Sequence, residues 1–260
     1  MSETLKDKAS RFAEQQHLMY GDVFLKRRVA KVEGEEDVSS FTTEDEMELF
    51  ENESESSWFA EKLRGIKEEW ASADSLDALQ QMICNCRKCQ LWEGRNKFVF
   101  GTGNPNADVV VIGEAPGADE DRLGEPFVGA AGKLLTKILE AINFSRDDVY
   151  ICNILKSRPP GNRRPEPNEI EACIPYLYKQ LELIKPRFIL AVGLTAAKAL
   201  LGTNKAMKDL RGNLHSWHGI PMIITYHPAA LLRNPQWKRP TWEDVQLLRK
   251  LYDESKEQKS

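Results

Sequence analysis

The chain has 260 residues, of which 41% are hydrophobic and 29% are charged, and its formal net charge at pH 7 is -4. This composition suits a globular protein of one or two domains, and no apolar run approaches the ~18 residues that cross a membrane. The polar start, MSETLKDKASRFAEQQ, does not read as a signal peptide. We therefore expect a cytoplasmic protein that does not associate with membranes.

The first 75 residues differ in charge from the rest of the chain. They carry 10 Lys and Arg against 19 Asp and Glu, a net charge of -9, which leaves +5 for residues 76–260. The stretch 33–55 holds eleven acidic and no basic residues, so it can bury little surface and we predict disorder there. Short helices are expected within 1–32 and 57–72. We interpret 1–75 as an acidic, largely disordered extension and a candidate binding segment for a protein partner.

From residue 76 onward, helices and strands alternate. SLDALQQMI predicts a short helix with Ser75 as its N-cap. Apolar runs predict strands at 108–113, 148–155, 187–193 and 222–227, and helices are expected at 129–142, 168–184, 195–201 and 240–254. Such strands between helices indicate a parallel sheet buried on both faces. The predicted fold class for 76–255 is α/β: a three-layer α/β/α sandwich with a central four-stranded parallel sheet.

Three polar side chains follow the predicted strands where ligands bind in such sheets, beyond the carboxyl ends. Glu114 follows the first strand, Asn153 lies on the second and His227 ends the fourth. An Asn amide matches the edge of a cyclic imide, a neutral His can donate to an oxygen that gains negative charge, and a Glu can orient water. Phe127 can stack on a flat ring. Together they favour a neutral planar heterocycle as ligand.

The loop after the first strand is rich in both glycine and acid. A strand, a glycine-rich turn and a helix usually cradle phosphate on backbone N–H groups. Here the loop carries four carboxylates, which would repel phosphate: Glu114, Asp119, Glu120 and Asp121. The acids therefore agree with an uncharged ligand.

Three segments resemble the signature regions of type 4 uracil-DNA glycosylases, the iron–sulfur members of that superfamily. They are GEAPGADEDRLGEPFVGAAGKLL, YICNILKSRPPGNRRPEP and TYHPAALLRNP, and the resemblance covers about 76–252. It implies an enzyme that flips uracil out of DNA and hydrolyses its N-glycosidic bond, leaving an abasic site and starting base excision repair. We expect a monomer whose partner is uracil-containing DNA.

The resemblance also implies residue roles. Phe127 would stack on uracil, Asn153 would read its polar edge, and His227 would stabilise negative charge on a uracil oxygen. Glu114 is our candidate for positioning the water. Pocket lining and loop support are assigned to Gly113, Ala115, Pro116 and Glu120. DNA contacts are assigned to Leu231 or Leu232, which would fill the gap left by the flipped base, and to Arg233, with Arg158, Arg163 and Arg164 on a basic loop.

Five cysteines, three of them within six residues, argue for a metal or cluster site rather than a disulfide framework. The resemblance implies a 4Fe-4S cluster bound by four cysteines. Cys86 and Cys89 match the C-x-x-C pair and Cys173 matches the ligand on the next helix. Ser157 stands where the family has its remaining cysteine.

Two cysteines are candidates for the vacant position. Cys152 is too far from Ser157 to replace it, because five extended residues span up to about 17 Å. Its side chain is also expected on the opposite face of the sheet from Asn153. Cys84 lies within about 7 Å of Cys86 along the chain, so we favour it as the fourth ligand. A three-cysteine cluster, a lost cluster and zinc remain alternatives.

Two other functions compete with the glycosylase. One is a relative that cross-links to abasic DNA through a histidine on an inserted loop, although no histidine follows Ser157 in that loop. The other is a catalytically weak DNA-binding and recruitment module. Activity on uracil-containing DNA, or a heat-stable covalent adduct, distinguishes the three.

Overall fold

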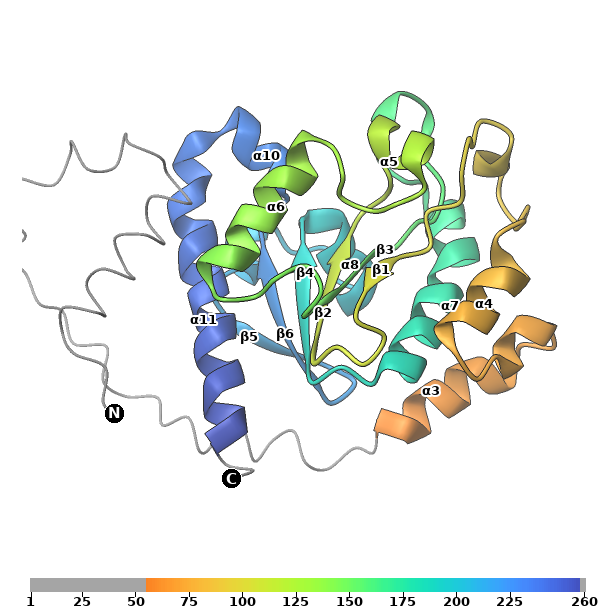
Figure 1. The fold of residues 1–260 in the computed structure, drawn as a ribbon, viewed down its shortest axis with the longest axis horizontal. Helices are drawn as coiled ribbons and strands as arrows, with labels where there is room; N and C mark the ends of the chain where they lie inside the picture. The colour runs from red at the N-terminus through yellow and green to blue at the C-terminus, as the bar shows by residue number, and fades with distance from the viewer. Residues whose placement is uncertain (1–54, 258–260) are drawn as a thin grey trace, which may run out of the picture.

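The computed structural model describes residues 55–257. The helices expected within 1–32 lie outside the described residues, and so do residues 33–54 of the stretch for which we predict disorder. Figure 1 shows one twisted sheet between two layers of helices, with the strand order β1-β3-β2-β4-β6-β5.

The four predicted strands form the parallel centre of this sheet, which confirms the predicted α/β class. They are β2 (Val109–Gly113), β3 (Tyr150–Asn153), β4 (Phe188–Val192) and β6 (Ile220–Thr225). Every residue of β2, β3 and β4 is buried, and β6 has one half-buried position. β-branched Val and Ile side chains on both faces explain why these segments form central strands.

Two short antiparallel strands extend the sheet and were not predicted. β1 (Thr102–Gly103) pairs with β3, and β5 (Leu214–Trp217) pairs with β6. β5 is mostly half-buried or exposed and has no apolar run, so periodicity does not reveal it. His218 and Gly219 join it to β6, both at positive φ, which suits a two-residue hairpin.

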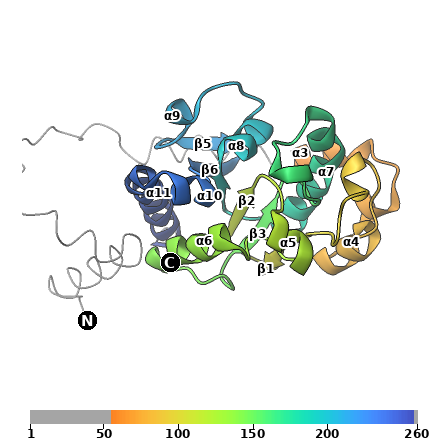
Figure 2. The ribbon, with the colours of Figure 1, turned by 90° about the horizontal axis from the view of Figure 1, so that it is seen from above.

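Helices cover both faces of the sheet (Figures 1 and 2). One face is covered by α4 (Leu76–Ile83), α7 (Pro167–Ile184) and α8 (Leu194–Leu201). The other is covered by α6 (Ala130–Ala141), α10 (Pro228–Arg233) and α11 (Lys238–Glu257). Shorter helical segments are α5 (Ala118–Leu123), α9 (Met207–Leu210), η3 (Gln90–Trp92), η4 (Pro160–Asn162) and η5 (Pro235–Trp237).

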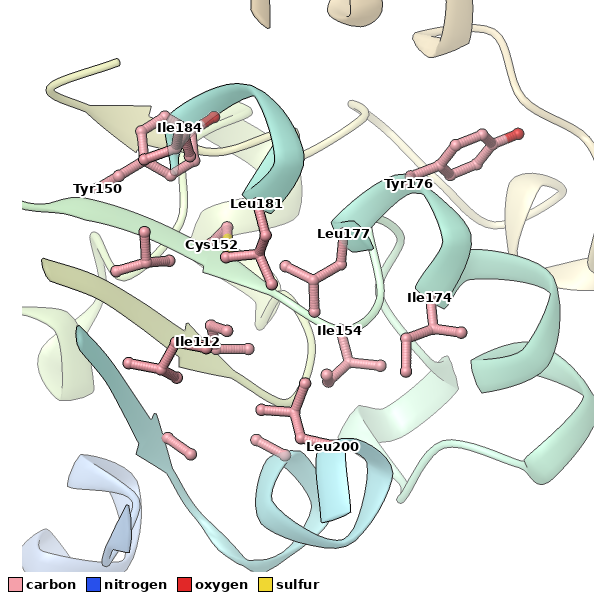
Figure 3. Close-up of a cluster of buried hydrophobic side chains, with 14 of the residues drawn as sticks. Ile112, Tyr150, Cys152, Ile154, Ile174, Tyr176, Leu177, Leu181, Ile184 and Leu200 are labelled. Carbon is pink, nitrogen blue, oxygen red and sulfur yellow. The ribbon is translucent and has the colours of Figure 1, made fainter. Parts of the chain in front are cut away.

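Alternation along the strands divides the core into two clusters. Ile112 and Cys152 belong to the cluster under α7, which also contains Leu177 and Leu181 (Figure 3). Val111 and Ile151 belong to the cluster on the other face. Cys152 is fully buried in this way, and it lies in the apolar core rather than in a polar site.

The folded part of the chain begins before the expected boundary at residue 76. α3 (Glu55–Arg64) packs on α7, and η2 (Glu69–Ser72) leads into α4. Four apolar side chains of this segment are buried in the core under α7: Phe59, Leu63, Trp70 and Ala73. The short helix expected within 57–72 is present as α3 and η2, but the acidic composition of the extension gave no sign that this segment packs into the core.

Within residues 55–257, no helix combines the length and the apolar character that crossing a bilayer requires.

The N-cap predicted for α4 is present, and it offers a small stability test. The Ser75 side chain accepts a hydrogen bond from the backbone N–H of Ala78 at 3.3 Å. Ser75→Ala is expected to lower the free energy of unfolding by about 1 kcal/mol, because one N–H at the helix start loses its partner. Urea denaturation measures this. Ser75→Asp keeps an acceptor and should retain the wild-type value, and equal losses in both variants would contradict the capping role.

Candidate active site

An open cavity of about 1230 Å³ lies beyond the carboxyl ends of β2, β3 and β4. Parallel strands end there together, so side chains distant in sequence meet at one edge of the sheet. Eleven of the residues singled out from the sequence line this cavity: Glu114, Ala115, Pro116, Asp119, Glu120, Phe127, Asn153, Arg163, Arg164, His227 and Arg233. Gly113 does not line the cavity but is the last residue of β2, directly before Glu114.

Asn153 holds a buried acceptor without a partner. It ends β3 opposite Gly113 and is only 2% exposed. No donor among the described residues reaches its side-chain Oδ1 atom. A buried acceptor left unpaired costs about 1–3 kcal/mol, and such atoms in native proteins are a sign of a ligand or of function. Asn153 therefore has the chemistry to accept a hydrogen bond from a ligand N–H.

Phe127 stands beside Asn153 in a strained backbone conformation. Its φ is +54°, which is uncommon for a bulky residue and costs on the order of 1–3 kcal/mol. The Arg146 guanidinium donates to the carbonyl oxygens of Phe127 at 3.1 Å and Pro126 at 3.0 Å. Gly132 leaves room for this turn, since a Cβ there would lie 1.8 Å from the Phe127 oxygen. Arg146 was not predicted as a site residue, because only folding brings it to Phe127.

Glu120 ties together the two ends of the loop that carries Phe127. Its carboxylate accepts hydrogen bonds from the N–H groups of Gly117 at 3.1 Å, Val128 at 2.9 Å and Gly129 at 2.9 Å. The buried Asp121 accepts from the backbone and the side chain of Asn96. Two of the four acids in this loop thus hold backbone in place.

His227 is the N-cap of α10 and faces the same cavity. Burial, with a smaller effect of the nearby Arg233, lowers the pKa of His227 to about 4, so the imidazole is neutral at pH 7. Its Nδ1 atom accepts the backbone N–H of Ala229 at 3.2 Å. The proton of a neutral ring must then be on Nε2, which becomes a donor. The ring stacks with Phe127, with centroids 5.5 Å apart.

Gly113 separates the two recognition side chains. A Cβ at this position would lie 2.4 Å from Asn153 Oδ1 and 2.5 Å from Phe127 Cζ. Gly113→Ala is expected to lower kcat/KM for the reaction proposed below by on the order of tenfold, since both side chains must shift. Gly94→Ala is a matched control, because a Cβ there meets nothing within 4 Å. Steady-state kinetics of both variants test this, and a Gly113→Ala enzyme with wild-type kcat/KM would contradict it.

The segment after His227 contains one exposed leucine. Leu231 is fully buried and belongs to the core, whereas Leu232 is 50% exposed. The assignment of Leu231 as a DNA wedge is therefore wrong, because its side chain cannot leave the core without unpacking α10. Leu232 remains the candidate of the two.

The basic loop is less free than its sequence suggests. Arg163 donates to both carboxylate oxygens of Glu169, at 2.9 Å and 2.6 Å. Arg158 donates to the side chain of Asn162 at 2.7 Å. Arg163 thus holds the start of α7, while Arg164 and Arg233 also line the cavity.

A second, small cavity brings three cysteines together. Cys86, Cys89 and Cys173 line it, with Ser157 and Arg95 among the other lining residues. Tyr176 Oη donates to Cys86 Sγ at 3.1 Å. Burial raises the pKa of the Cys89 thiol, and it raises that of Cys173 to about 12.

The thiol of Cys84 points toward the last turn of α4, not into the thiol-lined cavity. Its Sγ atom donates to the carbonyl of Gln81 at 3.3 Å, and it does not line the thiol cavity. Among residues 55–257, no group of three or more His, Cys, Asp or Glu side chains is arranged to hold a single metal ion. All five cysteines are free thiols.

Lys156 connects the two cavities and was not singled out from the sequence. It is fully buried, and burial lowers the pKa of its amine. Its Nζ atom donates to the Asn153 carbonyl at 2.8 Å and to Gln180 Oε1 at 2.6 Å, while its backbone N–H donates to Cys173 Sγ at 3.3 Å. One residue thus contacts both the strand end that carries Asn153 and a cysteine of the second cavity.

The sequence of this chain is similar to those of a known protein family. A model described as the uracil DNA glycosylase superfamily matches residues 100–248. A type-4 uracil-DNA glycosylase of Archaeoglobus fulgidus is 44% identical over 186 residues, covering 68% of this chain and 94% of that protein. Similar enzymes are found in Sulfurisphaera tokodaii, 42% identical over 68% of this chain and 85% of that protein, and in Thermotoga maritima, 41% identical over 66% and 91%.

Proposed function

This chain belongs to the uracil-DNA glycosylase superfamily, and we propose that it hydrolyses the N-glycosidic bond between uracil and deoxyribose in DNA. The observation that carries this function is the buried, unpartnered Oδ1 of Asn153, placed beside the ring of Phe127. Uracil presents an N–H between two carbonyl groups, so an amide can accept from the N–H and donate to an oxygen. The base enters the cavity after flipping out of the DNA.

Bond cleavage places negative charge on the leaving uracil. The C1′–N1 bond breaks, its electron pair moves into the uracil ring, and the oxygen of a water molecule bonds to C1′. The neutral His227, with its proton on Nε2, donates to a uracil oxygen as that charge develops. Glu114 orients the water and takes up its proton. Phe127, fixed by Arg146 and Glu120, sets the plane of the base.

An iron–sulfur cluster is part of the same proposal. Cys86, Cys89 and Cys173 would hold it, and the donor set suits one: three thiols face one cavity, and two of the sulfurs accept hydrogen bonds. Such a group would cross-link the 86–95 segment, the loop at Ser157 and α7. We assign it this structural role.

The remaining parts of the proposal concern the setting of the enzyme. We place it in the cytoplasm, acting as a monomer on uracil-containing DNA, with Leu232 at the gap left by the base and Arg233 at a phosphate. Free thiols agree with a reducing compartment. Of the acidic extension that we propose to bind a protein partner, residues 1–54 lie outside the described residues.

The decisive experiment is base release from an oligonucleotide that contains one uracil, read out as strand cleavage after alkali. Cleavage at the uracil, absent from a thymine control, is the expected result. A heat-stable covalent adduct would instead identify a cross-linking enzyme. Binding to the oligonucleotide without base release would identify a DNA-binding module and reject the glycosylase.

A further inference from the structure

The thiol cavity has three sulfurs and one hydroxyl facing it. Ser157 lies at the end of the turn that follows β3, and it is 6% exposed. It lines the cavity with Cys86, Cys89 and Cys173, which come from two other segments. The chain thus offers an oxygen donor where a fourth sulfur would complete a four-thiolate site.

A guanidinium holds that hydroxyl in place. Arg95 Nη1 donates to Ser157 Oγ at 3.2 Å and to the carbonyl oxygen of Cys86 at 3.0 Å. The same side chain lies over the Phe98 ring, 5.2 Å from its centroid. Because Arg95 donates to the hydroxyl oxygen, it stabilises negative charge there, and charge-assisted hydrogen bonds of this kind are the strong ones.

Cys84 is not in a position to replace the serine. Its thiol donates to Gln81 within the last turn of α4, and the cavity wall does not include it. Bringing Cys84 inward would break the end of α4, because Cys84 is its C-cap and its backbone N–H donates to the Gln80 carbonyl. The geometry therefore favours Ser157 over Cys84, contrary to the expectation from spacing along the chain.

We propose that this protein holds its cluster through three thiolates, from Cys86, Cys89 and Cys173, and that Ser157, supported by Arg95, is the ligand at the fourth iron. This inference rests on the cluster included in the proposed function. Oxygen is a harder and weaker donor than thiolate for iron in such clusters. One iron is then held less firmly than the other three. Mild oxidation removes it selectively: one electron passes to the oxidant, one Fe²⁺ leaves, and a three-iron cluster remains.

The test compares wild type, Ser157→Cys and Cys84→Ala, all purified without oxygen and titrated with ferricyanide. Iron and sulfide contents are measured, and electron paramagnetic resonance detects the three-iron cluster. We expect wild type and Cys84→Ala to hold equal iron and to convert equally, with one Fe²⁺ released per cluster. Ser157→Cys should lose this signal at the same oxidant concentration, because a fourth thiolate retains the iron.

Three results would overturn the inference. They are loss of iron in Cys84→Ala, equal conversion in wild type and Ser157→Cys, and protein isolated with zinc or without iron. If Ser157→Cys fails to fold, Arg95→Gln replaces it: release of iron at lower ferricyanide supports the inference, and an unchanged titration rejects it.

Uracil release from the same samples distinguishes failure of the Ser157 ligand proposal from failure of the glycosylase proposal. Protein that lacks the oxidisable iron and still releases uracil rejects only the Ser157 ligand. Protein with the expected iron chemistry and no uracil release rejects only the glycosylase.

Discussion

Replacing Asn153 with leucine is expected to lower kcat/KM for uracil release by about 10³-fold without lowering the free energy of unfolding. Activity falls because uracil then buries an N–H and a carbonyl oxygen that find no partner, and a site built for such hydrogen bonds discriminates strongly. Stability is retained because Oδ1 of Asn153 is already unpaired in the free protein. An apolar side chain of similar size removes that penalty, which is about 1–3 kcal/mol.

Thr225→Val is the matched control for a buried polar group that has its partner. Thr225 is 2% exposed, and its hydroxyl donates to Asp244 Oδ2 at 2.7 Å. Loss of this hydroxyl should lower the free energy of unfolding by about 1.5–3 kcal/mol, because its acceptor is a carboxylate, and should leave kcat/KM unchanged. Single-turnover kinetics and urea denaturation of both variants give the comparison. An Asn153→Leu protein that keeps its activity, or loses stability as Thr225→Val does, would refute the role given to Asn153.

Replacing His227 is expected to change both catalysis and the response to acid. His227→Leu should lower kcat by about 10²–10³-fold, because one donor to the developing oxyanion is lost. His227→Gln keeps a neutral donor and should recover part of that loss. If kcat of His227→Leu equals that of wild type, the histidine has no part in charge stabilisation.

The acid response follows from the lowered pKa. Unfolded His227 binds a proton near its ordinary pKa of 6.5, whereas the folded protein binds it only near 4. Between these values the unfolded state holds more protons, so stability falls as the pH drops from about 6.5 to 4, by up to about 3 kcal/mol. The difference between the wild-type and His227→Gln denaturation curves isolates the contribution of His227. Curves that run parallel across this window would show that the folded pKa is not lowered.

How much the sequence predicts depends on the range of the interaction. β2 and β3 were predictable because local apolar runs determine them, and their ends place Glu114 and Asn153 at one edge by topology alone. β5 was not, because a short half-exposed strand depends on pairing with β6 rather than on its own pattern. The burial of residues 55–75 in the core was not predicted, because the acidic residues around this segment made it look like part of a disordered extension.

Site details needed contacts that no local pattern records. Arg146 reaches Phe127 across 19 positions, and Lys156 reaches Gln180 across 24. Leu231 and Leu232 are adjacent and identical in type, so only the packing of α10 decides which one faces solvent. The direction of the Cys84 thiol likewise depends on where α4 ends.

The carboxylate of Glu120 gives the glycine-rich loop a built-in counter-ion. Helices α5 and α6 both start at this point, with Gly117 and Gly129 as their N-caps, and helix starts attract anions. The Glu120 carboxylate already accepts hydrogen bonds from the backbone N–H groups at this point. It therefore occupies the position in which a similar loop would bind phosphate. Free nucleotides and inorganic phosphate then gain nothing from the loop, and the cavity stays open to a base that arrives without charge.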